Sequence, residues 1–204
     1  MDNPGFNPNM FEEEIVALEQ KIANCPSFDQ LIIFYGSSSF RLWETMEQDL
    51  APLNTLNLGF GGSSFGWCIH YFNRLLGIIP KASHIVFYCG DNDLENGLSP
   101  ESVMKKFRTL LEITRDDFLT TPISVLTIKP SPSRTYLQPK IKLTNDLIRK
   151  NLIGSPKAYQ INIYDSMLNE RGVARPELYL DDELHMNDKG YKIWKGIIRK
   201  HFGV

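Results

Sequence analysis

Short apolar runs of strand length alternate along this chain with segments of helical apolar spacing. The continuous apolar run at residues 31–35 predicts a buried strand. Four later runs, each bounded by turn residues, predict further strands at residues 53–58, 84–89, 123–128 and 159–164.

Apolar residues spaced three and four apart predict helices around these strands. Ser99 and Pro100 form a typical helix start, with Ser99 as the N-cap and Pro100 in the first turn. Near the start of the chain, apolar residues with glutamates between them predict an amphipathic surface helix. The expected helices cover residues 11–22, 40–50, 63–79, 99–114, 140–152 and 187–201.

The order of elements, one helix followed by five β-α units, predicts an α/β fold with a mostly parallel sheet and helices on both faces. We expect an N-terminal helical segment at residues 1–30, packed on or preceding a single domain at residues 31–204. In such sheets ligands bind beyond the carboxyl ends of the strands, where the strand order reverses. The segments that follow the strands therefore carry the candidate chemistry.

The composition is that of an ordinary globular protein with little net charge. Of 204 residues, 42% are hydrophobic and 23% are charged, and 22 basic against 24 acidic side chains leave a net charge of −2. This balance argues against nucleic acid or an anionic membrane surface as the main partner. The apolar runs are also too short to span a bilayer, so no integral membrane segment is expected.

Three cysteines and the start of the chain indicate the compartment. Cys25, Cys68 and Cys89 cannot all pair with one another and lack metal-ligand spacing, so neither a disulfide scaffold nor a cysteine zinc site is expected. The first residues lack the basic end and apolar core of a signal peptide. We therefore expect a cytoplasmic protein, with a trimmed leader as the alternative. The sequence leaves the oligomeric state open.

The segment after the first strand, residues 36–40, reads Gly-Ser-Ser-Ser-Phe. Small residues allow a sharp turn into a helix and leave a hydroxyl at the helix start, where backbone N–H groups favour an oxyanion. Simple helix capping by serine is the alternative. The Gly-x-Ser-x-Gly elbow of α/β-hydrolases is not matched, because Phe40 replaces the second glycine.

The segments after the second and third strands are also rich in turn residues. Residues 57–64 contain Gly59, Gly61 and Gly62, but match neither a dinucleotide fingerprint nor a P-loop. Residues 90–93 read Gly-Asp-Asn-Asp, where Asn92 could donate its amide to a developing negative charge, and a calcium-loop pattern fails there. An ordinary glycine turn and a polar turn are the respective alternatives.

Asp182 and His185 lie just before the last expected helix. An aspartate at this spacing can accept from the imidazole and fix its tautomer, which leaves the other ring nitrogen as a general base. An acidic surface run that caps the helix is the alternative. The remaining histidines, His70, His84 and His201, are expected to be structural.

These blocks, in this order, resemble the SGNH (GDSL-type) hydrolase family of esterases and acylhydrolases, over about residues 31–200. The Gly-x-Asn-Asp and Asp-x-x-His blocks match in full. Ser37 stands where the family usually has aspartate. The stretch at residues 35–43 looks closest to the branch of platelet-activating-factor acetylhydrolase subunits.

The resemblance implies a three-layer, flavodoxin-like fold with a five-stranded parallel sheet. It implies hydrolysis of carboxylic esters, short-chain acyl or acetyl, through an acyl-enzyme, with no metal or organic cofactor. Ser38 would be the nucleophile, His185 the general base and Asp182 its partner, while Gly62 and Asn92 would serve the oxyanion. The three adjacent serines leave open which one attacks.

Two other functions stay open at this stage. The same sheet edge could bind a small anion or nucleotide without catalysis, since helix starts attract anions. A scaffold that has lost catalysis is the second alternative. Phe60, Phe65 and Trp67 could line an apolar substrate pocket or belong to the core.

Overall fold

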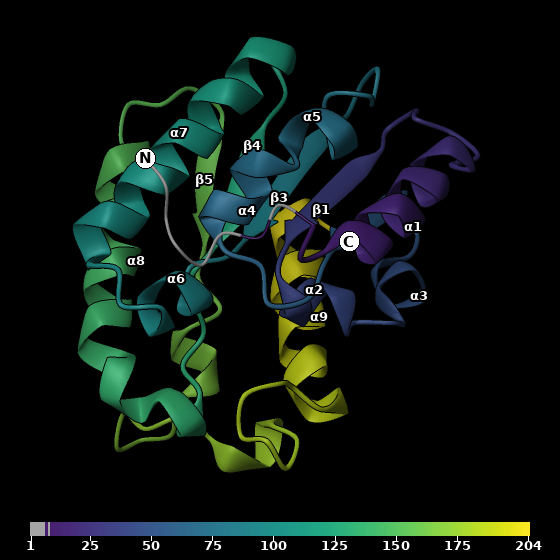
Figure 1. Cartoon of the computed structure of the whole chain (residues 1–204). Coiled ribbons are helices and arrows are strands. Elements are labelled where there is room, and N and C mark those ends of the chain that lie inside the picture. Colours follow the sequence, from purple (N-terminus) through teal and green to yellow (C-terminus); the bar gives the residue numbers. More distant parts are fainter. Residues whose placement is uncertain (1–6, 8) are drawn as a thin grey trace.

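The computed structural model describes residue 7 and residues 9–204, and its centre is a five-stranded parallel sheet (Figure 1). The strand order is β2-β1-β3-β4-β5, which reverses direction between β1 and β3. The predicted α/β, flavodoxin-like fold is confirmed. The strands are β1 (Ile32–Gly36), β2 (Thr55–Gly59), β3 (His84–Tyr88), β4 (Ile123–Leu126) and β5 (Ala158–Ile161).

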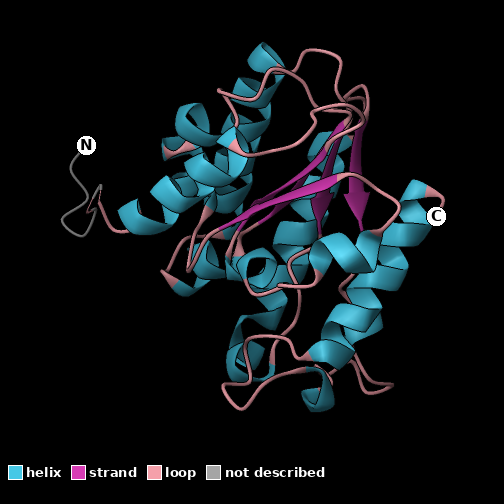
Figure 2. Cartoon of the chain, turned by 90° about the vertical axis from the view of Figure 1, so that its right-hand side faces the viewer, coloured by secondary structure: helices cyan, strands magenta, loops and turns pink. Residues whose placement is uncertain are grey.

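Helices cover both faces of the sheet, so that the molecule has three layers (Figure 2). One face carries α1 (Glu12–Ala23), α4 (Phe65–His70), α5 (Phe72–Leu75), α7 (Pro100–Asp117) and α8 (Gln138–Leu152). The other face carries α2 (Ser38–Arg41), α3 (Met46–Leu50) and α9 (Asp188–Phe202). The remaining helices are α6 (Asp91–Glu95) and the 3-10 turns Pro132–Leu137, Asp165–Met167 and Pro176–Leu178.

The sheet separates two apolar cores. Alternate residues of a strand point to opposite faces, so Ile33 and Tyr35 enter one core while Ile32 and Phe34 enter the other. Every residue of β1 is buried, as its continuous apolar run predicts. Within the described part of the chain, no helix combines the length and apolar character that crossing a bilayer requires.

Helix α1 packs on the domain at the glycine-rich side. The Phe11 ring meets Phe60 and Trp67 edge-on, with centroid distances of 5.4 and 5.2 Å. Arg74 of α5 donates to Glu12 and Glu19 at 2.7 Å each. Residues 1–6 and 8 of the expected N-terminal segment lie outside the described residues, so the boundary at residue 30 stays a prediction.

Two expected helices are wrong as single elements. Residues 40–50 form α2 and α3, because Trp43 and Thr45 both donate to the Asp49 carboxylate, at 2.8 and 2.6 Å, and hold a turn between them. Residues 63–79 form α4 and α5, separated at Tyr71, which leaves helical geometry (φ −93°, ψ 6°) with its ring stacked on Trp67.

The other helices and strands differ less from their expected bounds. Ser99 caps α7 by accepting from the Ser102 backbone N–H, as predicted. Asn187, expected as the first residue of the last helix, is its N-cap. Both β4 and β5 end before their expected limits. Residues 91–95 form the short helix α6, which was not expected, since a polar turn was the alternative considered for residues 90–93.

Candidate active site

The loops that follow β1, β2 and β3 are joined by hydrogen bonds at the carboxyl edge of the sheet. The Gly36 carbonyl accepts from the Phe60 backbone N–H at 3.1 Å and from the Ser63 hydroxyl at 3.0 Å. The Ser63 carbonyl in turn accepts from the Asn92 side-chain amide at 3.0 Å. The three segments that the sequence singled out therefore lie together at the point where the strand order reverses.

A hydroxyl, an imidazole and a carboxylate form one line across this edge. The Ser38 Oγ lies 3.0 Å from His185 Nε2, although the two residues are 147 positions apart in the chain. On the other side of the ring, His185 Nδ1 lies 2.5 Å from Asp182 Oδ2. The second Asp182 oxygen accepts from the backbone N–H groups of Leu184 and His185, both at 2.9 Å. The carboxylate is thus held on both oxygens and faces the ring.

The charge of Asp182 fixes the imidazole tautomer. Partial burial acts to raise the pKa of Asp182, but hydrogen bonds from the His185 ring and from two backbone N–H groups outweigh it and lower the pKa to about 2. An ionised carboxylate only accepts, so the proton sits on His185 Nδ1. The Nε2 lone pair then faces the Ser38 hydroxyl, which is the arrangement that lets an imidazole take a proton.

The structure distinguishes the three adjacent serines. Ser37 is fully buried, is the N-cap residue of α2, and its hydroxyl makes neither a cap bond nor any other hydrogen bond within the described residues. Ser39 is 2% exposed, and its carbonyl accepts from the Tyr191 hydroxyl. Ser38 is the serine whose hydroxyl meets an imidazole. Helix α2 is a single turn, so backbone N–H groups rather than a long helix dipole are what it offers at this point.

Gly62 and Asn92 each present a donor at the same edge. Gly62 has φ +60°, a conformation that favours glycine, and no atom lies within 4 Å of the position where a Cβ would stand. Its N–H has no protein acceptor in the described part of the chain. Asn92 donates to the Ser63 carbonyl, and its Oδ1 accepts from Arg134 Nη1 at 3.1 Å.

Two largely buried cationic side chains next to Asn92, those of Lys129 and Arg134, were not predicted from the sequence. Lys129 is 1% exposed and lies 3.7 Å from Asp91 Oδ2, and Arg134 lies 3.3 Å from the same oxygen. Burial lowers the pKa of Lys129, while the Asp91 charge acts in the opposite direction. The position of Lys129 could have been inferred from the sequence, because it follows β4 by three residues and so lies at the same sheet edge as the segments after β1, β2 and β3.

The aromatic residues considered as a substrate pocket belong to the core. Phe60 and Phe65 are fully buried, and Trp67 is partly buried against the same cluster. His84 and His201 lie at the opposite, amino edge of the sheet, where each ring bonds to the Ser124 hydroxyl.

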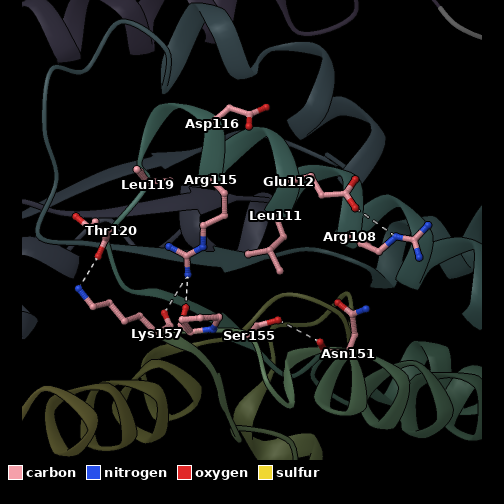
Figure 3. Close-up of a pocket in the computed structure, with 11 residues that line it drawn as sticks. Arg108, Leu111, Glu112, Arg115, Asp116, Leu119, Thr120, Asn151, Ser155 and Lys157 are labelled. Atoms are coloured by element: carbon pink, nitrogen blue, oxygen red, sulfur yellow. Dashed lines mark hydrogen bonds and ion pairs between the residues drawn. The ribbon is translucent and has the colours of Figure 1, made fainter.

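Of two hollows in the surface, one lies far from the Ser38–His185 contact and the other is lined by residues next to it in the chain. A cavity of about 620 Å³ lies between α7, α8 and the segment before β5, at the amino edge of the sheet (Figure 3). Arg115 in this cavity already donates to the carbonyls of Thr121 and Pro156. A groove of about 570 Å³ is instead lined by Leu42, just beyond α2, and by Met186, which follows His185.

Comparison with known proteins identifies the family. The GDSL-like lipase/acylhydrolase family model matches residues 31–193, and the chain belongs to this family. Family membership supports the hydrolysis of an ester substrate. No curated protein sequence matches the chain.

Solved structures share the fold at low sequence identity. A protein from Streptococcus pneumonia, provisionally described as a platelet activating factor, is 17% identical with a TM-score of 0.82, over 93% of this chain and 91% of its own. A GDSL-like lipase from Bacteroides thetaiotaomicron is 16% identical with a TM-score of 0.76, over 93% and 97%. The C-terminal domain of Drosophila Oskar is 16% identical with a TM-score of 0.68, over 91% and 100%.

Proposed function

We propose that this protein hydrolyses carboxylic esters through an acyl-enzyme on Ser38. The observation that carries the proposal is the continuous line from Ser38 Oγ through the His185 ring to Asp182, with contacts of 3.0 and 2.5 Å. A serine hydroxyl is a weak nucleophile unless an oriented base removes its proton. This line provides such a base and fixes its tautomer.

The reaction proceeds in two halves. His185 Nε2 takes the Ser38 proton as Oγ bonds to the ester carbonyl carbon, and the imidazolium then gives that proton to the departing alkoxide, which leaves as the alcohol. Water attacks the acyl-enzyme with His185 again as base, and the Ser38 oxygen leaves and regains a proton. Asp182 stabilises the imidazolium in both halves and stays ionised.

The oxyanion of each tetrahedral intermediate needs donors that are already in place. We assign these to the backbone N–H groups of Ser38 and Gly62 and to the Asn92 amide. Ser38 is the first residue of α2, where an N–H has no intrahelical acceptor. One such donor is worth roughly 100- to 1000-fold in rate.

For the substrate, we propose a short-chain acyl or acetyl ester. Phe40 and Tyr88 are fully buried next to the Ser38 segment, which favours a small acyl group on that side. We assign the alcohol part of the ester to the groove lined by Leu42, Trp43, Leu180 and Met186. Leu42 lies just beyond α2, and Met186 directly follows His185. The protein would act without a metal or organic cofactor.

Labelling with a fluorophosphonate, followed by peptide mapping, tests the nucleophile and catalytic competence together. We expect one label on Ser38 and hydrolysis of p-nitrophenyl acetate. Ser38→Ala should remove the label and lower kcat/KM by roughly 10⁴-fold or more. Ser37→Ala is the matched control, because its hydroxyl has no partner, and should keep both. An unlabelled but folded wild-type protein, as expected of a pure binding module, or full activity in Ser38→Ala, would overturn the proposal.

A further inference from the structure

Arg134 lies behind Asn92, on the side away from the Ser63 carbonyl. Its Nη1 donates to Asn92 Oδ1 at 3.1 Å, and the same nitrogen lies 3.3 Å from Asp91 Oδ2. Its Nε lies 3.5 Å from Glu95 Oε2. Only 12% of the side chain is exposed, so the guanidinium is held within the fold rather than free on the surface.

A side-chain amide offers an oxygen on one side and an NH₂ on the other, and it can rotate to exchange them. The surroundings of Asn92 allow one of the two orientations. Arg134 can only donate, so it requires the amide oxygen on its side, and the Ser63 carbonyl can only accept, so it requires the NH₂. The bond to Ser63 uses one of the two N–H groups, and the second has no acceptor among the described residues.

The cation also affects the strength of that free N–H. A charged donor on the oxygen of an amide withdraws electron density from the group and makes its N–H a better donor, which is the cooperative effect seen in hydrogen-bond chains. Asp91, which contacts the same nitrogen, and Glu95, which contacts Nε, keep the guanidinium in place. Arg134 therefore belongs to a series of polar contacts that runs from Glu95 and Asp91 to Asn92.

We propose that Arg134 is a positioning residue for ester hydrolysis, which orients and polarises the Asn92 amide so that its free N–H can serve the oxyanion. The inference rests on the proposed function, because it assigns Arg134 a role through Asn92. Arg134 itself does not touch the reacting atoms. A guanidinium is suited to this task, since its planar fork reaches Asn92, Asp91 and Glu95 at once and a lysine ammonium does not.

A double-mutant cycle with Arg134→Lys and Asn92→Ala tests this role. Arg134→Lys keeps the charge beside Asp91, and we expect kcat to fall roughly tenfold with KM changed less than about twofold. Asn92→Ala should lower kcat by roughly 100-fold. In the Asn92→Ala background, Arg134→Lys should change kcat by less than about twofold, because the group it acts through is gone. Arg149→Lys, at an exposed surface pair, is the matched control.

A purely structural role predicts the same loss from Arg134→Lys in both backgrounds, and that result would overturn the proposal. NMR of the Asn92 side-chain NH₂, assigned by its loss in Asn92→Ala, provides a readout that needs no turnover. Its two proton signals should shift and broaden in Arg134→Lys and stay unchanged in Arg149→Lys. Unchanged signals in Arg134→Lys reject the positioning role. An inactive wild-type protein, or an active Ser38→Ala, would instead reject the proposed function while this spectrum still decides on Arg134.

Discussion

The two edges of the sheet each bring a serine hydroxyl against an imidazole. At the carboxyl edge, Ser38 meets His185 at 3.0 Å. At the amino edge, Ser124 lies 2.8 Å from His84 and 3.2 Å from His201. The residue types and distances are nearly the same, yet the surroundings of the two contacts differ in every respect that matters for chemistry.

The carboxyl-edge contact has an oriented base and a hydroxyl on a residue that is 8% exposed. Asp182 holds the far side of the His185 ring, and Ser38 opens a helix at the end of a strand. Ser124 is instead fully buried within β4, and its two partners are both imidazoles. Burial, and secondarily the charge of His201, lower the pKa of His84 to about 4. A serine–histidine contact therefore becomes a candidate catalytic pair only with a third group that orients the base.

The largest expected difference between the edges is in turnover. His185→Ala should lower kcat/KM for p-nitrophenyl acetate by roughly 10⁴-fold, because it removes the proposed base. His201→Ala, at the amino edge, should change it less than about twofold. Equal losses in the two variants would end the distinction that we draw between the edges.

The next effect is on stability in acid, at the amino edge. The folded-state pKa of His84 lies at about 4, below its ordinary 6.5, so the fold favours the neutral ring. The contribution of neutral His84 to the free energy of unfolding is fully present above pH 6.5. It is lost as pH drops from 6.5 towards 4, by about 3 kcal/mol in total. The burial that raises the pKa of Asp93 to about 6 acts in the opposite direction. Urea unfolding of wild type and His84→Gln between pH 4 and 7.5 measures this contribution as the difference between their free energies of unfolding. A difference that does not change with pH would refute the lowered pKa of His84.

The smallest effect separates the two hydroxyls. Ser124→Ala should cost about 1–2 kcal/mol of unfolding free energy, because it leaves the ring nitrogen of the buried His84 without its partner. Its kcat should stay within about twofold of wild type. Ser38→Ala should show the reverse, with little change in unfolding free energy and loss of turnover. Thermal or urea unfolding together with the esterase assay measures both quantities, and a Ser124→Ala protein of normal stability would contradict the structural role given to that hydroxyl.

Local sequence was sufficient for much of the fold. Short apolar runs predicted the five strands, and the run at residues 31–35 is unbroken because β1 is buried on both faces. The alternation of strands with helices predicted that the sheet is mostly parallel. The helix start at Ser99 was also predictable, because a cap depends on neighbouring residues. The break between α2 and α3 was not predictable, because Asp49 makes it through side-chain bonds that compete with the helix.

For the candidate site, the residue types and their order along the chain already suggested Ser38, Gly62, Asn92, Asp182 and His185. Chain order gives no distances, so the packing of strands and loops decided which of the three serines meets the imidazole. It also decided that Ser124 makes a similar contact at the other edge.

The role of Arg134 could not be predicted for the same reason, since its partners Asp91, Asn92 and Glu95 lie about 40 positions away. The sequence by itself determined the strands, most of the helices, the parallel sheet and the candidate chemistry, because these follow from periodicity and local capping. The tertiary structure alone decided which polar groups meet, because such contacts join residues that are distant in the chain and are selected by burial and by the pairing of donors with acceptors.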